Sequence, residues 1–380
     1  PAGAPTVLLY AHHDVQPPGT EQGWTTPAFE PAERAGRLYG RGAADDKAGV
    51  AVHVGALRAV LAQWGPDDGV GVTVFVEGEE EVGSPTFAAF LREHRALLAA
   101  DVVVVADSDN WDVDTPSLTT SLRGLVDATV VVRTLDHPVH SGLYGGPVLD
   151  ATTALVRLLD RLRDETGGLA VPGLRAGPAP EVPFGEERLR ADAGVLDGVQ
   201  LLGDGTVAQR LWTGPALTVV GVDVPPLERA SNTLQGTATA HLSLRVPPGQ
   251  QPEEALAALR EHLLATAPWG ARVEVAMDGG GQPFQARVDG PVHDLAVESL
   301  ARAWDGAAPV HAGIGGSIPF IADLVDALPG AVVLVTGVED PDTRAHGHDE
   351  SLHLRVLERA TLAEALLLAG LRDAVPTPAG

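Results

Sequence analysis

Apolar runs and amphipathic segments alternate along the first third of the chain. Strands are predicted at 7–10, 70–76 and 101–106, where β-branched residues cluster, and helices at 47–64 and 85–99, where apolar residues recur at helical spacing. Strands separated by helices of this length indicate an α/β layer with a mostly parallel sheet. In such sheets, ligands bind beyond the carboxyl ends of the strands.

The pattern changes after residue 123. Strands are predicted at 125–133, 216–222, 234–246 and 272–276, and helices at 147–163 and 252–266. Their order, strand–helix–strand–strand–helix–strand, is that of a ferredoxin-like unit. A Gly-rich run at 278–281 is interpreted as the hinge that leads back to the first layer.

Helix–strand alternation resumes over 290–380, with a strand at 331–336 and a closing helix at 354–373. The length of 380 residues also fits two domains better than one. We therefore expect one domain built from 1–122 and 283–380, with a second domain, 123–282, inserted into it.

The composition excludes several kinds of metal site and binding partner. The chain has no cysteine, which excludes disulfides and thiolate metal sites, so any metal must be held by His, Asp and Glu. The net charge of −25 argues against nucleic acid as a partner, because a phosphate backbone requires a basic surface. No apolar run approaches membrane-spanning length, and no secretory leader is visible, so a cytoplasmic location without membrane contact is expected.

Two polar residues that point to the same side follow the first predicted strand. Residues two apart in an extended segment point the same way, so His12 and Asp14 share a face. Histidine suits metal ligation, and a carboxylate behind it fixes its tautomer. The same two residues also fit an ordinary polar strand end.

The Gly-rich turn LYGRGAADDK leads into the helix predicted from residue 47. Its spacing is not that of a phosphate-binding loop, and its carboxylates would repel phosphate. Asp45 lies where a loop can present a carboxylate inward. Asp46 and Lys47 fit the role of helix-start residues, because acidic residues favour the first turn.

Acidic residues also follow the other two strands. The run EGEEE at 77–81 fits a solvated surface in an acidic protein, but neighbours in extended backbone project to opposite sides. One of these glutamates can then bind metal while its neighbour faces the substrate, as a metal-plus-base mechanism requires. Asp107 directly follows the third strand, where a cap or turn role is the alternative.

The motif RAHGHDE at 344–350 places His346 in a Gly-rich loop after a buried strand, where an ordinary loop histidine is the alternative. Together the motifs supply enough nitrogen and oxygen ligands for two metal ions that share one carboxylate, about 3.5–4 Å apart. Zinc suits such ligands, and Co²⁺ or Mn²⁺ could substitute. His348 is left out of the ligand set.

The motifs resemble those of one family, in order and over nearly the whole chain. The resemblance is carried by YAHHDVQPPG, W-x-x-PAFEP, LYGRGAADDKAG, VEGEEEVGS, HSGLYGG, IGGSIPF and AHGHDES. They resemble the co-catalytic di-zinc family of carnosinase-type dipeptidases, succinyl-diaminopimelate desuccinylase, acetylornithine deacetylase and aminoacylase. The family's N-terminal helical lead-in is not seen before the first strand.

The resemblance implies a fold for each domain. The first domain would be a zinc-exopeptidase-like α/β catalytic domain with a mostly parallel central sheet. The inserted domain would be an α+β ferredoxin-like lid that also forms a homodimer.

The resemblance also implies a role for each polar residue at the strand ends. His12 and Asp107 would complete one zinc site, Glu81 and His346 the other, and Asp45 would bridge the two ions. Glu80 would be the general base, and Asp14 would orient His12. The family pattern further implies a cis peptide bond after Asp45.

Substrate contacts carry over from the family as well. His140 resembles the lid histidine that reaches the partner subunit's active site and polarises the scissile carbonyl, with a plain turn histidine as the alternative. Asn232 and Arg245 resemble residues that neighbour or bind the substrate carboxylate, for which arginine is well suited. Gly316 and Ser317 would bind the same end. Many relatives carry Glu two residues before Gly316, where this chain has Ile314.

We predict a metal-dependent hydrolase that cleaves dipeptides, closest to the bacterial dipeptidases. The long segment 165–215 favours this branch, because it resembles the enlarged lid of dipeptidases. An N-acyl-amino-acid amidohydrolase with the same metal chemistry is the first alternative. A non-catalytic metal-binding relative is the second alternative, although each expected ligand and base position is filled.

Overall fold

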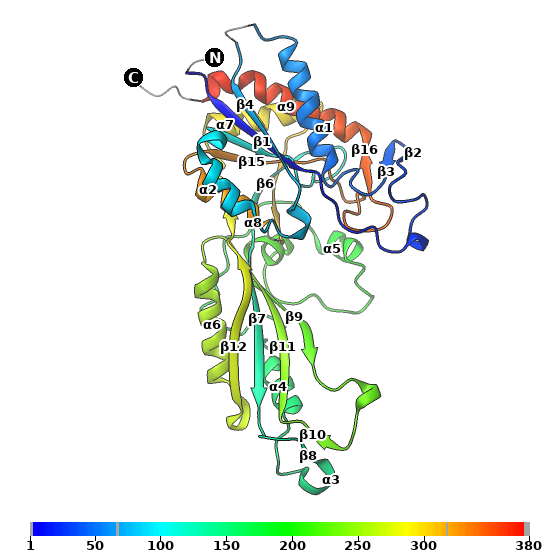
Figure 1. Ribbon diagram of the computed structural model, residues 1–380, viewed down its shortest axis with the longest axis vertical. Coiled ribbons are helices and arrows are strands. Elements are labelled where there is room, and N and C mark those ends of the chain that lie inside the picture. Colours follow the sequence, from blue (N-terminus) through cyan, green and yellow to red (C-terminus); the bar gives the residue numbers. More distant parts are fainter. Residues whose placement is uncertain (1–2, 66–67, 317, 376–380) are drawn as a thin grey trace. The chain divides into compact units, whose positions relative to one another are not determined.

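The computed structural model describes residues 3–65, 68–316 and 318–375 (Figure 1). The chain divides into two units. Unit 1 comprises Pro1–Thr120, Gln285–Ala312 and Pro319–Gly380, and unit 2 comprises Ser121–Phe284 and Gly313–Ile318. Within the described ranges, no helix is both long and apolar enough to cross a membrane.

Three parallel strands form the centre of unit 1. β1 (Thr6–His12) lies between β4 (Gly71–Glu77) and β5 (Val102–Val105) and runs parallel to both. β15 (Val332–Val335) continues the sheet in parallel beside β5. The predicted parallel sheet is therefore confirmed. The whole strand order is β13-β6-β15-β5-β1-β4, with β14 also paired to β6.

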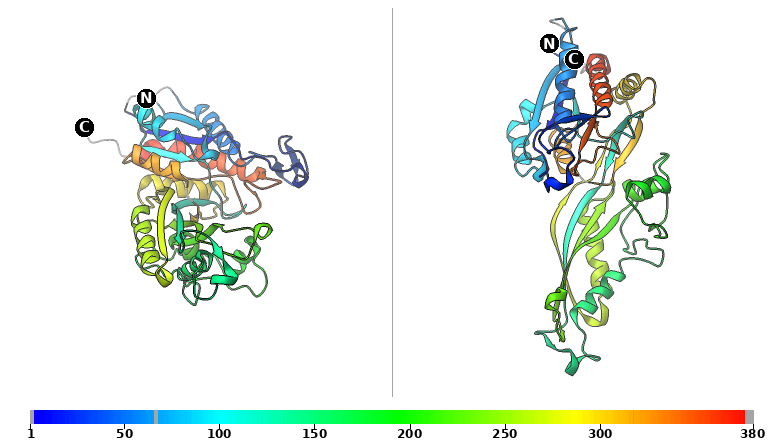
Figure 2. Two further views of the ribbon diagram at one scale, coloured as in Figure 1. Left: turned by 60° about the horizontal axis from the view of Figure 1, so that its bottom comes forward. Right: turned by 90° about the vertical axis from the view of Figure 1, so that its right-hand side faces the viewer.

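Helices cover both faces of these strands, which is why β1 is apolar on both sides. Val7 and Leu9 belong to the core shared with α1 (Lys47–Leu61), α7 (Pro291–Ala303) and α9 (Leu354–Ala374). On the other face, Tyr10 contacts the rings of Phe87 and Phe320, from α2 (Phe87–Leu98) and α8 (Pro319–Ala327). Figure 2 shows the two helix layers from further sides.

Unit 2 is built on a four-stranded antiparallel sheet in the order β12-β7-β11-β9. Its strands and main helices are β7 (Gly124–Arg133), α4 (Ala151–Asp160), β9 (Ala216–Asp223), β11 (Thr237–Val246), α6 (Pro252–Ala265) and β12 (Arg272–Gly281). Alternate residues of β7, from Val126 to Val132, are buried against the two helices, and the residues between them lie on the uncovered face. This is the predicted ferredoxin-like order.

The remaining strands and helices are short. The strands are β2 (Ala32–Arg34), β3 (Arg37–Tyr39), β6 (Ser117–Leu122), β8 (Val139–His140), β10 (Thr233–Leu234), β13 (Phe284–Gln285), β14 (Val310–Ile314) and β16 (Ser351–His353). The helices are η1 (Glu21–Gly23), η2 (Glu80–Val82), α3 (Ser141–Tyr144), α5 (Glu186–Asp192), η3 (Gln209–Thr213), η4 (Leu227–Arg229) and η5 (Pro268–Gly270). Strands β2, β3 and β16 form a small sheet that joins the N-terminal and C-terminal parts of unit 1.

The hinge predicted at 278–281 is wrong. Those residues belong to β12, which stays paired with β7 as far as Gly281. The register shifts between Met277 and Gly279, so the strand accommodates an irregularity there instead of ending. Glycines in a strand pattern often mark such a bulge rather than a break.

Candidate metal centre

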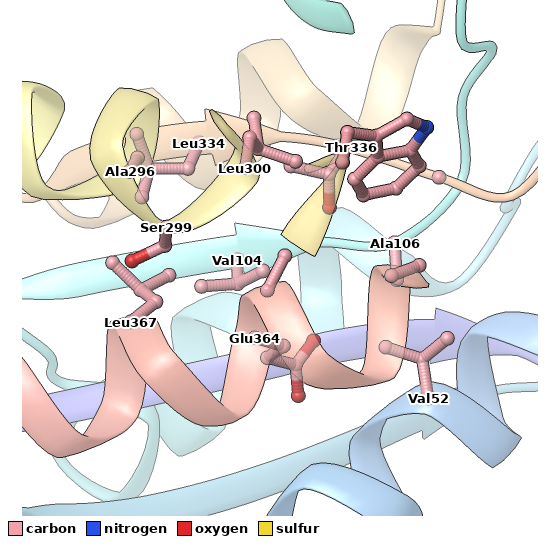
Figure 3. Close-up of a pocket in the computed structure, with 14 residues that line it drawn as sticks. Val52, Val104, Ala106, Ala296, Ser299, Leu300, Leu334, Thr336, Glu364 and Leu367 are labelled. Atoms are coloured by element: carbon pink, nitrogen blue, oxygen red, sulfur yellow. The ribbon is translucent and has the colours of Figure 1, made fainter. Parts of the chain in front are cut away.

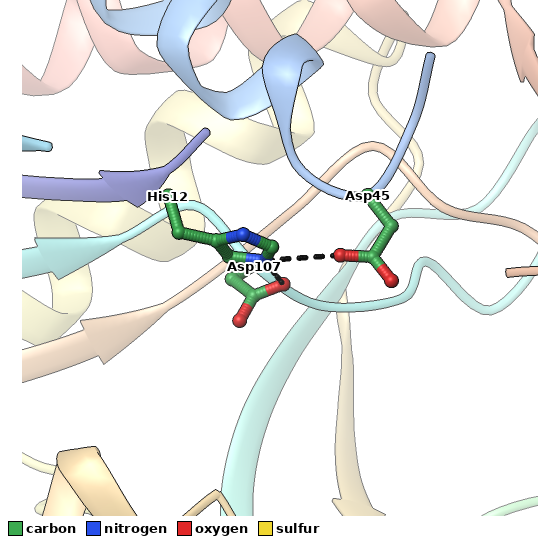
Figure 4. Close-up of side chains that lie close together, drawn as sticks. All are labelled: His12, Asp45 and Asp107. Carbon is green, nitrogen blue, oxygen red and sulfur yellow. Dashed lines mark ion pairs between the residues drawn. The ribbon is translucent and has the colours of Figure 1, made fainter. Parts of the chain in front are cut away.

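Adjacent strand ends of unit 1 bring the predicted polar residues together. His12 is the last residue of β1, and Asp107 follows the end of the neighbouring β5. Glu80 and Glu81 lie in η2, just after β4 on the other side of β1. Asp45 comes from the loop before α1, so its carboxylate and that of Asp107 face His12 from two elements (Figure 4).

The side chains form two groups that share Asp45. His12, Asp45 and Asp107 offer ligand atoms that all lie within 4.8 Å of one another, and so do Asp45, Glu81 and His346. Asp45 Oδ1 lies 3.0 Å from His12 Nε2, and Asp45 Oδ2 lies 2.9 Å from His346 Nε2. One carboxylate therefore presents a separate oxygen to each histidine, as a bridging metal ligand does.

The donor set fits divalent metal ions. His12 Nε2 is fully buried and, within the described residues, has no hydrogen-bond partner, although Asp45 Oδ1 and Asp107 Oδ1 lie 3.0 and 3.8 Å away. A buried nitrogen without a hydrogen bond is costly unless something else binds it. Four carboxylates lie around the two histidines, those of Asp45, Glu80, Glu81 and Asp107. A bound cation offsets the repulsion between these negative charges. These residues therefore fit a metal pair.

The electrostatics of the side chains agree with this fit. Burial alone would lower the pKa of His12, but the carboxylates of Asp107 and Asp45 outweigh it and raise that pKa to about 12. A metal ion takes the neutral imidazole, so metal binding at His12 displaces a proton.

Asp14 holds both His12 and the helical turn that carries the glutamates. Its Oδ1 lies 3.3 Å from His12 Nδ1, the ring nitrogen that faces away from Asp45. The same carboxylate accepts hydrogen bonds from the backbone N–H groups of Glu80 (3.3 Å) and Glu81 (3.0 Å). Asp14 thus contacts the His12 imidazole through its carboxylate and through its backbone carbonyl, which lies 3.2 Å from Nδ1. It also binds η2, which the sequence did not indicate.

Glu80 lies close to the group without belonging to either ligand cluster. Its Oε2 is 4.0 Å from His12 Nε2. Burial, together with the nearby charge of Asp107, raises the pKa of Glu80 to about 8. A carboxylate with a pKa near neutrality is suited to accept and return a proton.

The loop before α1 contains the cis peptide bond expected after Asp45, between Asp45 and Asp46. Asp46 caps α1 as predicted, accepting from Gly49 N at 3.1 Å. Its other oxygen accepts from His12 N at 3.0 Å, and Lys47 Nζ donates to His13 O at 2.8 Å. These two residues therefore also tie the loop to the end of β1.

Two residues that sequence reasoning missed hold the ligands from behind. Glu350 is fully buried and accepts from Arg41 Nη1 (2.6 Å), Gly42 N (3.0 Å), Ala44 N (3.1 Å) and Asp45 N (3.2 Å). Gln16 binds Glu81, donating its backbone N–H to Oε1 (3.0 Å) and its side-chain amide to Oε2 (2.9 Å). Gln16 lies in the block YAHHDVQPPG and Glu350 in AHGHDES, so membership of these blocks is the signal that could have drawn attention to them.

The segment that carries His346 has unusual backbone geometry. Arg344, His346 and Asp349 all have positive φ values, of 57°, 61° and 56°. Such conformations cost energy in residues other than glycine and persist where surrounding contacts hold them. Asp349 supplies one such contact by accepting from Thr25 N (2.9 Å) and Thr25 Oγ1 (2.7 Å).

The predicted substrate residues belong to unit 2. His140 ends β8 and is exposed, and its Nδ1 accepts from Gly142 N at 3.0 Å. Asn232 is nearby, since its carbonyl accepts from Ser141 N at 2.9 Å. Arg245 lies on β11, and Gly316 belongs to the segment Gly313–Ile318 of the same unit. Ser317 lies outside the described residues.

A cavity in unit 1 is not a substrate site. Figure 3 shows it between the sheet and the layer of α1, α7 and α9, lined mainly by apolar side chains such as Val104, Leu300 and Leu367. The volume open to the centre of a water molecule is about 30 Å³. That is room for a water molecule or two but not for a dipeptide.

Comparison with known proteins decides the family. The sequence matches the model of peptidase family M20/M25/M40 over residues 8–369. The chain belongs to this peptidase family. The family predicted from the sequence motifs is therefore confirmed, and so is the prediction of a metallopeptidase.

Relatives of this peptidase cover most of the chain. It is 41% identical to a cysteinylglycine-S-conjugate dipeptidase of Corynebacterium striatum over 369 residues, which are 96% of this chain and 81% of the relative. It is 29% identical to a Beta-Ala-His dipeptidase of Rattus norvegicus, over 92% of this chain and 73% of the relative.

Solved structures share the fold. The di-peptidase Dug1p from Saccharomyces cerevisiae matches with a TM-score of 0.78 and 24% identity, over 99% of this chain and 81% of the other. The M20 family metallo-carboxypeptidase Sso-CP2 from Sulfolobus solfataricus matches with a TM-score of 0.80 and 22% identity, over 97% and 85% of the two chains. The predicted combination of a catalytic α/β domain with an α+β domain is that of these peptidases.

Proposed function

We propose that this family member is a dipeptidase that works with two divalent metal ions, most simply Zn²⁺. The observation that carries the proposal is the position of Asp45, whose two carboxylate oxygens each lie about 3 Å from a different histidine. His12 and Asp107 would hold one ion, Glu81 and His346 the other, and Asp45 both. Bound there, the ions supply Lewis acidity toward a water molecule and a carbonyl oxygen.

Glu80 is the proposed general base. It takes a proton from the attacking water, and the resulting hydroxide adds to the carbonyl carbon of the peptide bond. Glu80 then returns the proton to the amide nitrogen, the C–N bond breaks, and a free amine and a carboxylate leave. Burial raises the pKa of Glu80 and so supports this cycle, because it favours the protonated carboxyl that must exist between the two transfers. Asp14 keeps His12 in place throughout.

A dipeptide is favoured over an N-acyl amino acid. The relative with 41% identity is named for cysteinylglycine S-conjugates, so dipeptides of the Cys-Gly type are the first substrates to test. The proposed substrate residues are His140, Asn232, Arg245, Gly316 and Ser317.

We also propose that unit 2 is a lid and dimerisation domain, and that the catalytic domain is 1–122 with 283–380. In this proposal, His140 of the partner subunit polarises the scissile carbonyl, so the active form is a homodimer. A cytoplasmic location fits a peptidase that recycles amino acids. A monomer with full activity in solution would contradict the dimer.

The test is hydrolysis of a dipeptide panel that includes Cys-Gly and an S-substituted Cys-Gly, compared with acetyl- and succinyl-amino acids. Each substrate is measured with the native protein, after chelation, and after Zn²⁺ is added back. Metal-dependent release of free amino acids from dipeptides is expected. Turnover of the acylated amino acids alone would move the protein to the deacylases.

A further inference from the structure

Arg123 is buried at the point where the chain enters unit 2, and it binds a distant segment of that unit. Its backbone N–H donates to Ile314 O at 3.4 Å, and its Nε donates to Gly315 O at 2.9 Å. Its Nη1 lies 3.3 Å from Gly214 O. A single side chain therefore joins three separate parts of the sequence.

The segment approaches so closely that only glycine fits. A Cβ at Gly315 would lie 2.7 Å from Arg123 Nη2 and 3.0 Å from Leu211 O. A Cβ at Gly313 would lie 2.6 Å from the Cβ of Trp212. The backbone at Gly313 and Gly315 is thus held against Trp212, Leu211 and Arg123 by contacts that a larger residue would displace.

Arg123 also lies beside Arg245. Arg245 is paired with Leu125 across β11 and β7, and Arg123 precedes Leu125 by two residues. Diagonal neighbours of this kind lie on the same side of an antiparallel pair, within reach of long side chains. Burial and, to a smaller extent, the charge of Arg245 together lower the pKa of Arg123 to about 10. Two guanidinium groups in such a place repel each other, and an anion between them relieves the repulsion.

We infer that Arg123 is a positioning residue for the carboxylate end of the substrate. It fixes the backbone of Ile314 and Gly315, next to Gly316, and places a second positive charge beside Arg245, so that the free α-carboxylate of a dipeptide is recognised in unit 2. This inference rests on the proposed function.

The chemistry favours a carboxylate as the ligand. Guanidinium groups present planar pairs of N–H donors that match a carboxylate. In a dipeptide, the α-carboxylate belongs to the second residue, so its recognition restricts cleavage to substrates that end there. A C-terminal amide has the same shape without the charge and is therefore the natural probe.

The experiment compares hydrolysis of Cys-Gly with hydrolysis of Cys-Gly amide by wild-type protein, Arg123→Met and Arg123→Lys. The matched control is Arg163→Met, because Arg163 also donates to two backbone carbonyls in unit 2, Gly167 O and Leu217 O. Melting curves and metal content are measured for every variant, so that a folding defect is recognised separately.

Wild-type protein and Arg163→Met should prefer Cys-Gly. In Arg123→Met, KM for Cys-Gly should rise by about 10²-fold, as a misplaced binding group typically causes, with a much smaller change in kcat. The preference of Arg123→Met for Cys-Gly over Cys-Gly amide should nearly vanish. Arg123→Lys should recover part of the preference for Cys-Gly, because lysine restores the positive charge but not the planar pair of N–H donors of arginine. An unchanged preference in Arg123→Met, or equal losses on both substrates, would overturn the inference.

Failure of the proposed function gives a different result. If wild-type protein hydrolyses neither compound, dipeptidase activity toward this class is disproved. Binding of the same two compounds to the metal-loaded protein is then measured by calorimetry. A preference for the free carboxylate that disappears in Arg123→Met supports the inference, and its absence from wild-type protein contradicts it.

Discussion

Glu350 binds several parts of the centre at once. Its carboxylate binds the loop of Asp45 through three backbone N–H groups and Arg41, and it lies only four residues after His346. It therefore couples the two loops that supply Asp45 and His346. Groups that orient ligands from behind typically contribute 10–100-fold to metal affinity.

Replacing Glu350 by Gln should weaken metal binding without unfolding the chain. One oxygen of Glu350 becomes an NH₂ group in the glutamine. This group cannot accept the hydrogen bonds that Arg41 and the backbone N–H groups of the Asp45 loop donate, so the loop shifts. We expect a loss of about 10–100-fold in Zn²⁺ affinity, measured by calorimetry and metal analysis. Glu358→Gln on the exposed side of α9 is the control. Equal affinity in both variants would show that Glu350 has no such role.

Replacing Glu80 by Gln should separate metal binding from turnover. Glu80 belongs to neither ligand group, so metal content should stay at the wild-type level. Loss of a general base lowers kcat by about 10²–10⁴-fold. The measurement is metal analysis together with steady-state kinetics on the best dipeptide. Wild-type kcat in this variant would refute the base assignment.

At this scale, the sequence predicted which residues meet but not what holds them. His12, Asp45, Glu81, Asp107 and His346 were found because each has a ligand side chain just beyond a predicted strand or in a loop. Glu350 and Gln16 were missed because their partners are far away in sequence, so their function depends on contacts that only folding creates.

Among the elements, α1 and α9 are joined by a buried ion pair. His53 Nδ1 lies 2.9 Å from both oxygens of Glu364, and His53 Nε2 lies 2.9 Å from Tyr10 O on β1. An imidazolium can donate from both ring nitrogens at once, as this geometry requires. Burial alone would lower the pKa of His53, but the Glu364 carboxylate and the Tyr10 carbonyl raise it overall.

Glu364→Gln should therefore destabilise the protein more at pH 6 than at pH 9. A histidine with a raised folded-state pKa stabilises the fold below its ordinary value of 6.5, and this contribution is lost as the pH rises through the folded-state pKa. Removing one partner of a buried ion pair lowers the free energy of unfolding by about 3–5 kcal/mol, and we expect this loss at pH 6. Denaturant melts of the variant and wild-type protein at both pH values provide the check. A pH-independent difference would contradict the charged pair.

The sequence predicted long elements well and short ones poorly. Strands β1 and β5 were found because buried parallel strands are almost entirely apolar. β6, SLTTSL, was missed because its polar residues show no such run. Strands β2, β3 and β16 have three residues each, too few for a periodicity to appear.

For the whole molecule, all proposed metal ligands belong to unit 1. They come from its first and last segments, so metal binding joins parts of the chain that unit 2 separates in sequence. Unit 2 contributes none of the proposed ligands. Metal ions should therefore stabilise the two units unequally.

Calorimetric scans with and without Zn²⁺ should show this difference. Metal at about 1,000 times its Kd adds about 4 kcal/mol, which raises the Tm of a unit of this size by roughly 10 °C. The transition of unit 1 should shift by this amount, and that of unit 2 should stay in place. Point variants in each core, Leu9→Ala in unit 1 and Leu242→Ala in unit 2, assign the transitions. A shift of the unit 2 transition alone would contradict the assignment of the ligands.

The discontinuity of unit 1 has a consequence for the growing polypeptide. The ribosome releases His12, Asp45, Glu81 and Asp107 early, but His346 only after the whole of unit 2 has been made. Since domains generally fold as they emerge, unit 2 can reach its native state while unit 1 still waits for β15, β16, α9 and His346. Hydrolytic activity then begins only after His346 and the α9 helix that follows it have been made.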